Sequence, residues 1–196
     1  PSLIGQPVVV GGRPDGRGVI ATANYTARSY GVRSAMPSAQ ALRLCPHLVF
    51  IKPDMAKYRQ ASEGMHQVFQ RYTALIEPLS LDEAYLDVSD SDAFDGSATR
   101  IAQAIKSEVR DSVGICVSAG VSVNKFLAKV ASDWEKPDGL TVLPPHKVEA
   151  FVQDLPLRKF PGVGPKFSQR LADDGLAVGR DLLAVSRRDC VRRYGS

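Results

Sequence analysis

Two adjacent carboxylates, Asp82 and Glu83, interrupt an otherwise apolar, strand-like run over residues 78–88. A run of this kind normally enters a protein core, where unpaired carboxylates are costly. No basic residue lies within the run to balance the pair. The pair therefore needs solvent at the tip of a hairpin, or a cationic partner such as a divalent metal. For an isolated Asp-Glu pair the solvated turn is the commoner case, so other stretches must decide between the two.

Composition indicates a globular protein with a mild positive charge. The chain has 196 residues, of which 44% are hydrophobic, enough for one large domain or two small ones. The net charge is +4 and the pI is about 9.1, which is compatible with a nucleic-acid partner but does not establish one. Basic residues concentrate near the C-terminal end, and this segment is expected to meet something acidic. They are Arg158, Lys159, Lys166, Arg170, Arg180, Arg187, Arg188, Arg192 and Arg193.

The cysteines and the N-terminal sequence bear on the cellular compartment of the protein. Cys45, Cys116 and Cys190 are odd in number and lack C-x-x-C spacing, which favours reduced thiols in a cytosolic protein. No apolar run is long enough for a membrane span, and the N-terminus lacks the form of a signal peptide. We therefore expect no membrane association. The sequence opens on Pro1 without an initiating Met, so we expect a piece of a longer protein.

The first third of the sequence predicts a hairpin, two short helices, a strand and a long helix. Residues 8–10 and 18–23 are the strands of the hairpin, and residues 24–31 form one or two helical turns ended by glycine. A helix over residues 38–45 and a strand over residues 48–51 follow. Asp54 can cap the long helix. Its apolar stripe predicts a core face made of Met65, Val68, Phe69, Tyr72, Leu75 and Ile76.

The middle of the chain predicts an α+β fold. After the acidic hairpin come helices over residues 97–113 and 124–135, and strands over residues 115–121 and 140–143. This order suggests an antiparallel-rich sheet with helices on one face. Beyond Pro144 the strand signals stop and only helical patterns follow, so a small all-helical domain is expected after a boundary near that residue.

A Pro-Gly-x-Gly turn in this last domain resembles a helix-hairpin-helix motif. Gly162 and Gly164 would let backbone N–H groups converge at the start of the next helix, where a phosphate is favoured. Both glycines are expected to have positive φ, which bulky side chains disfavour. Lys159 and Lys166 flank the turn suitably for phosphate. Such motifs hold DNA by its backbone without identifying bases. The alternative is an ordinary Gly-Pro connection between helices.

Three further residues decide nothing by themselves. Tyr25 and Arg28 are three residues apart and would share a helix face, but they could equally be a core aromatic and a surface charge. Lys136 precedes Pro137 near a predicted helix C-terminus, where any cation is favourable.

Taken together, these stretches resemble the Y-family translesion DNA polymerases over essentially the whole chain. Residues 21–37 (ATANYTARSYGVRSAMP) look like the fingers motif of that family, and residues 80–87 (SLDEAYLD) look like its acidic palm motif. Residues 118–139, which end in KPDG, resemble a second palm stretch, and the turn at Pro161 resembles the DNA clasp of the thumb. The resemblance implies fingers over residues 1–75, palm over 76–145 and thumb over 146–196.

The resemblance also implies site residues. Asp82 and Glu83 would be catalytic and would ligate two magnesium ions. Tyr25, Arg28 and Lys136 would hold the triphosphate of the incoming dNTP. Phosphoryl transfer needs mainly positioning and charge, which metals and a cationic clamp supply. Small residues would line a roomy pocket next to the templating base, which is consistent with tolerance of damaged templates. These are Ala21, Ser34 and Ala35, with Val19 beside them.

The sequence departs from the family pattern at its ends. Members begin with a strand that carries another metal-binding Asp and an aromatic that excludes ribonucleotides, and neither is expected here. The little-finger domain and the terminal sliding-clamp peptide are also missing, so the activity of the chain by itself is in doubt. In the full-length protein the implied partners are primer-template DNA, dNTP and the sliding clamp. The implied location is the bacterial cytoplasm, in association with the nucleoid.

A second hypothesis from a different class remains open. The chain could be a non-catalytic module that binds the DNA backbone through Gly162, Gly164 and Lys166, with a structural acidic pair. Magnesium-dependent binding of dNTP is expected only of the polymerase.

Overall fold

The computed structural model describes residues 3–195, which divide into two compact units, Pro1–Arg59 and Gln60–Ser196. The boundary falls inside helix α3 (Met55–Phe69), so this helix belongs partly to each unit. The predicted division at residue 75 into fingers and palm stays a prediction.

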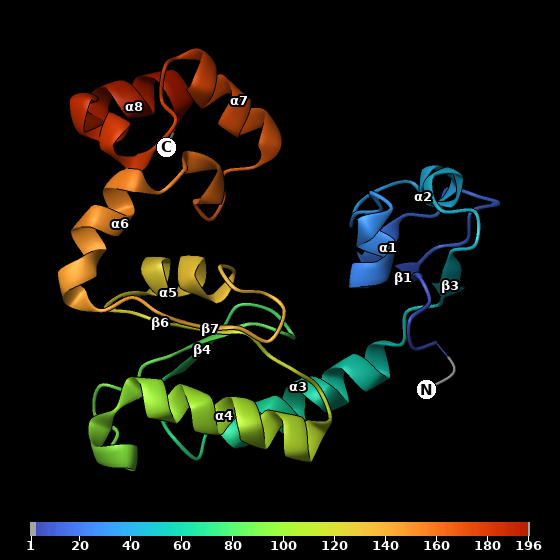
Figure 1. Ribbon diagram of the computed structural model, residues 1–196, viewed down its shortest axis with the longest axis horizontal. Helices are drawn as coiled ribbons and strands as arrows, with labels where there is room; N and C mark the ends of the chain where they lie inside the picture. Colours follow the sequence, from blue (N-terminus) through green and yellow to red (C-terminus); the bar gives the residue numbers. More distant parts are fainter. Residues whose placement is uncertain (1–2, 196) are drawn as a thin grey trace. The chain divides into compact units, whose positions relative to one another are not determined.

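The first unit is built on a three-stranded sheet in the order β2-β1-β3 (Figure 1). Strands β1 (Val8–Gly11) and β2 (Ile20–Ala23) are antiparallel, which confirms the predicted hairpin. Strand β3 (Val49–Ile51) pairs with β1 in parallel. The predicted short helices are α1 (Tyr25–Ser29) and α2 (Ser38–Leu44).

Helix α1 is fixed at its start by Asn24. The Asn24 side-chain oxygen accepts hydrogen bonds from the backbone N–H of Ala27 at 2.8 Å and of Val8 at 3.0 Å, so one residue caps the helix and joins it to β1. The buried core of this unit lies between the sheet and both helices. Its members are Val9, Ile20, Ala23, Ala27, Val32, Ala41, Cys45 and Leu48.

Helix α3 begins as predicted and ends earlier than its apolar stripe suggests. Asp54 accepts a hydrogen bond from the backbone N–H of Lys57 at 3.3 Å, and Met65 and Val68 are buried against α4 (Ala98–Val113). The stripe was expected to continue through Leu75 and Ile76, which is wrong. The helix stops at Phe69, Leu75 is 59% exposed, and Ile76 already starts a strand. A stripe of apolar residues does not itself mark where a helix ends.

The second unit contains two separate strand pairs. Strands β4 (Ile76–Pro78) and β5 (Ala84–Leu86) form the predicted antiparallel hairpin. Strands β6 (Ala119–Val121) and β7 (Leu140–Val142) are parallel and are joined through α5 (Lys125–Ser132). The α+β class is confirmed, but parallel and antiparallel pairings occur equally among the described strands, so the sheet is not antiparallel-rich. The reason is the crossover through α5, which returns the chain in the same direction.

Helices α4 and α5 both contact the β6–β7 pair, and Figure 1 shows them on opposite sides of it rather than on one face. Their predicted starts are confirmed, because Ser97 and Asn124 cap them through their side chains. Helix α5 ends at Ser132, three residues before the predicted end, and Trp134 beyond it is 47% exposed. Strand β6 is also shorter than the predicted range.

The chain after Pro144 is helical, as predicted, and has a core of its own around Leu157, Leu171 and Leu176. Among the described residues, no helix combines the length and apolar character needed to cross a membrane. The remaining helical elements are η1 (Ala93–Gly96), η2 (Pro145–Lys147), α6 (Val148–Asp154), η3 (Leu157–Lys159), α7 (Pro165–Asp173), η4 (Gly179–Ala184) and α8 (Arg187–Tyr194).

Gly120 sets how closely α5 lies on β6, and this contact can be tested. A Cβ at this position would overlap the carbonyl oxygen of Ala128 and the amide nitrogen of Ser132, both backbone atoms of α5. We expect Gly120→Ala to lower the free energy of unfolding by about 1–3 kcal/mol, the usual cost of overpacking. At this chain length each kcal/mol lowers Tm by about 2–4 °C, measured by calorimetry. Gly16→Ala is the control, because a Cβ there meets nothing within 4 Å. Equal Tm values would contradict the argument.

Candidate active site

The acidic pair lies in the tip of the β4–β5 hairpin. Pro78 and Ala84 form the last strand pair, and the backbone N–H of Leu79 donates to the Glu83 carbonyl oxygen at 2.9 Å. Asp82 is exposed, and its carboxylate accepts a hydrogen bond from the Ser80 hydroxyl at 2.7 Å. Asp82 is therefore exposed to solvent at the hairpin tip, which is one of the two environments expected for the acidic pair.

Glu83 has a cationic partner that the sequence analysis missed. The Lys129 ammonium lies 2.5 Å from Glu83 Oε1, with 22% of the lysine side chain and 40% of the glutamate side chain exposed. One turn earlier on α5, Lys125 forms an ion pair with Glu77 of the same hairpin. The cationic partner that the pair was expected to need is therefore present for Glu83, and it is a lysine of a distant helix rather than a residue within the run. Apolar spacing on α5 gave no signal of it, although two lysines four residues apart share a helix face.

Lys136 lies in the same unit as the acidic hairpin. Its ammonium is 2.5 Å from Asp133 Oδ1, and the residue is exposed beyond the end of α5 rather than in its last turn. The next residues turn the chain into β7. Lys136 is therefore an exposed cation on the turn between α5 and β7.

Tyr25 and Arg28 lie together on α1, in the first unit. Tyr25 is 57% exposed, so it is not a core aromatic. The Arg28 Nε–H donates to the carbonyl oxygen of Ala23 at 2.9 Å, which anchors the guanidinium stem at the end of β2. The pair thus presents an aromatic hydroxyl and a cation from one short helix.

The small residues of the predicted template pocket gather along β2. Ala21, Ser34 and Ala35 are exposed. Ala35 donates its N–H to the Ile20 carbonyl oxygen at 2.8 Å, so residues 34–35 run beside the strand that carries Ala21. Ala35 has a φ of 64°, a conformation in which a larger side chain would be strained. The result is an open strip of small side chains.

The Pro161 turn leads into α7 with its glycines facing open space. Gly162 has a φ of 88°, whereas Gly164 caps α7 with a φ of −77° that any residue can adopt. The expectation of positive φ at both glycines is thus wrong for Gly164. A Cβ at either position would meet nothing within 4 Å, so both leave the backbone accessible. Lys166 lies in the first turn of α7, where N–H groups lack helical partners.

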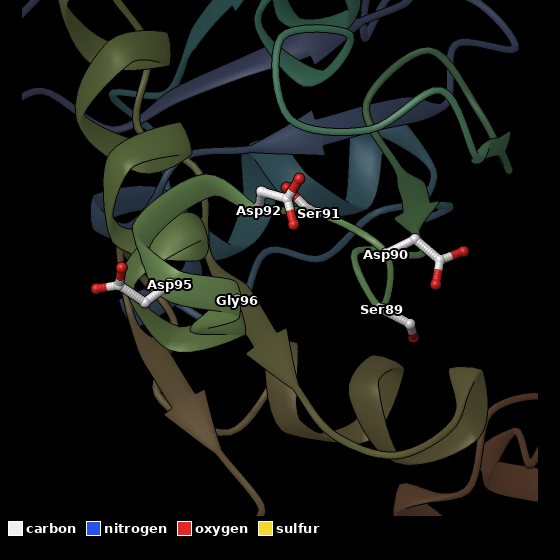
Figure 2. Close-up of a pocket in the computed structure, with 6 residues that line it drawn as sticks. All are labelled: Ser89, Asp90, Ser91, Asp92, Asp95 and Gly96. Atoms are coloured by element: carbon white, nitrogen blue, oxygen red, sulfur yellow. The ribbon is translucent and has the colours of Figure 1, made fainter.

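A hollow in the described part of the chain lies apart from these residues. It has a volume of about 630 Å³ and is lined by Ser89, Asp90, Ser91, Asp92, Asp95 and Gly96, none of them a predicted site residue. Figure 2 shows that its carboxylates point in different directions. Within residues 3–195, no group of three or more His, Cys, Asp or Glu side chains could hold a metal ion.

The acidic pair nevertheless fits the ligand chemistry of magnesium, which prefers hard oxygen donors and binds through one or two carboxylates. Asp82 is accessible, and Glu83 is held by a single lysine that a stronger cation can replace. The hairpin thus carries two carboxylates of the chemical type that such a site would need.

Comparisons with known proteins show the family of the chain. Residues 1–133 match the model of the impB/mucB/samB family, and residues 145–175 match that of the helix-hairpin-helix motif of the same family. DNA polymerase IV of Pseudomonas putida (strain GB-1) is 56% identical over the whole chain, which covers 55% of that protein.

Solved structures give the same result. DinB from Sulfolobus solfataricus is 33% identical with a TM-score of 0.92, and the chain covers 58% of it. A structure described as an insertion ternary complex of Dbh DNA polymerase is also 33% identical, with a TM-score of 0.91 and 58% covered. The chain spans little more than half the length of these relatives. These matches confirm the resemblance to Y-family polymerases, and the chain belongs to the impB/mucB/samB family.

Proposed function

We propose that this chain is part of a DNA-directed DNA polymerase that copies damaged templates, with Asp82 and Glu83 as its catalytic carboxylates. The observation that carries the proposal is the accessible carboxylate pair at the hairpin tip, in a chain whose relatives are named DNA polymerase IV. Two bound magnesium ions would supply charge neutralisation at the transferring phosphate. Asp82 and Glu83 would hold these ions, and the metal charge would replace the Lys129 ammonium as the partner of Glu83.

Tyr25, Arg28 and Lys136 hold the incoming triphosphate. A guanidinium, an ammonium and a phenol hydroxyl all donate hydrogen bonds, and phosphate oxygens accept them strongly. Arg28 is already anchored through Nε, so less side-chain entropy is lost when its remaining N–H groups bind a phosphate. Lys136 exchanges Asp133 for the phosphate.

The exposed strip of Ala21, Ser34 and Ala35 lies over the templating base. Small side chains leave room for a damaged base, which is the physical basis of translesion synthesis. The open turn at Gly162 and Gly164 holds the DNA backbone, and Lys166 adds a cation there. Primer-template DNA and dNTP are the partners of this site, and the sliding clamp and a nucleoid location belong to the full-length protein.

The alternative is a non-catalytic module that binds the DNA backbone. It is favoured by the Glu83–Lys129 ion pair, which could make Glu83 structural, and by the separate core of the helical part. Magnesium-dependent binding of dNTP to this chain distinguishes the two, since only the polymerase requires it.

The role of the acidic pair can be tested in a chimera that replaces the matching residues of the Pseudomonas putida relative with this chain. Asp82→Asn or Glu83→Gln should lower the rate of single-nucleotide incorporation about a thousandfold or more, because several kcal/mol of charge stabilisation are lost. Glu77→Gln on the same hairpin is the control and should retain activity. Unfolding of the variants, seen as a lost thermal transition, would instead favour a structural pair.

The exchange of Lys129 for a metal predicts a change in divalent affinity. Lys129→Met should lower the Kd for Mn²⁺ up to about fivefold, because a partly exposed ion pair is worth at most about 1 kcal/mol. Lys125→Met is the matched control, since its partner Glu77 is outside the predicted metal pair. Electron paramagnetic resonance of free Mn²⁺ gives both constants. Equal affinities in the two variants would show that Lys129 does not compete with metal.

The thumb turn predicts DNA binding that is indifferent to sequence. Gly164→Val is compatible with the backbone there, so it should keep the fold and weaken binding to every duplex about tenfold by blocking phosphate contacts. Ala172→Val, exposed at the other end of α7, is the control. Lys166→Ala should reduce the salt slope by about one unit. Titration of labelled primer-templates at several salt concentrations measures both, and undiminished binding by Gly164→Val would place the contact elsewhere.

A further inference from the structure

Lys106 of α4 is a largely buried lysine whose ammonium is fully occupied by protein oxygens. Only 12% of its side chain is exposed. The ammonium donates to the carbonyl oxygen of Val117 at 2.5 Å, to that of Asp138 at 3.0 Å, and to the Asp138 carboxylate at 2.7 Å. An ammonium has three N–H donors, so Lys106 has none left for a substrate. The role of Lys106 must therefore be to hold other parts of the protein in place.

The segment that Lys106 holds is the turn between α5 and β7. Arg110, one helical turn after Lys106, forms a second ion pair with the same Asp138 carboxylate. The hydrogen bond from Lys106 lowers the pKa of the Asp138 carboxyl below its usual value, so Asp138 stays ionised near neutral pH. Two cations from one helix thus hold one carboxylate of the turn.

Further contacts, besides these two ion pairs, restrict the backbone of the turn. Asp138 has a φ of 55°, which is uncommon for a residue with a side chain. At Gly139 a Cβ would overlap the carbonyl oxygen of Glu135, and the Gly139 N–H donates to the Ser118 hydroxyl at 3.2 Å. The Ala119 N–H in turn donates to the Gly139 carbonyl oxygen at 3.0 Å. The backbone two residues after Lys136 is therefore fixed to α4 and to β6.

We propose that Lys106, Arg110 and Asp138 form a clamp that positions Lys136 for the triphosphate of the incoming nucleotide. The proposal rests on the role of Lys136 given above. Lys136 carries a long flexible side chain on an exposed turn, so its ammonium reaches a defined point only if its backbone is rigid. If the turn only connected α5 to β7, it could lack a charge, and no lysine would have to be buried to balance it. Lys106, Arg110 and Asp138 are positioning residues, and Lys136 makes the phosphate contact.

The test uses the chimera with the Pseudomonas putida relative for kinetics and this chain for hydrogen–deuterium exchange. Lys106→Met should raise the KM for dNTP about tenfold, because a misplaced Lys136 ammonium makes a weaker charge-assisted contact to phosphate, and should change kcat less than about twofold. Amide exchange over residues 134–140 should quicken at the same time. Arg110→Met, whose side chain is 51% exposed and safe to replace, should act in the same direction.

The matched control is Arg100→Met, which breaks an ion pair with Asp95 near the other end of α4. It should change neither KM nor exchange over residues 134–140. If Lys106→Met does not fold, Arg110→Met and Asp138→Asn carry the test. A raised KM in Lys136→Ala with an unchanged KM in the clamp variants would overturn the clamp and leave the proposed function intact. An unchanged KM in Lys136→Ala would remove Lys136 from the triphosphate site, and the clamp proposal with it.

Discussion

Charge compensation between a helix and a turn is the interaction on which the second unit depends. The β4–β5 hairpin carries Glu77 and Glu83, and α5 supplies Lys125 and Lys129 to meet them. On α4, Lys106 and Arg110 meet Asp138 in the same manner. The Lys106–Asp138 pair differs from the others because only 12% of the Lys106 side chain is exposed, so removing its carboxylate would leave a largely buried charge uncompensated.

Local structure was largely predictable from the sequence because local interactions decide it. Caps at Asn24, Ser97 and Asn124, the first hairpin and the β4–β5 hairpin all follow from short-range patterns. The early end of α3 and the parallel β6–β7 pairing could not be obtained this way. Each depends on tertiary packing, and the close approach at Gly120 is visible only once α5 lies on β6.

The sequence predicts residues for the candidate site, which stay predictions, but it does not predict the partners that these residues have in the structure. Motif resemblance gave Asp82, Glu83 and Lys136, whose chemistry is that of the side chain itself. Lys129 and Lys106 were missed because their partners are distant in sequence and an isolated lysine on a helix normally faces solvent. Gly164 was assigned the wrong backbone conformation, because a glycine that admits a ligand and a glycine that needs positive φ look alike in a sequence.

The predicted site residues share one property that separates them from the core. Asp82 is held by Ser80, Glu83 by Lys129 and Lys136 by Asp133, each through a contact on a partly or fully exposed side chain. Such contacts contribute little to stability, about 1 kcal/mol or less for an exposed ion pair. A divalent ion or a phosphate group carries more charge than the resting partner and can displace it at small cost. Lys106 differs from them, because it is largely buried and its ammonium donates to three protein oxygens, so a ligand could not displace its partners at small cost.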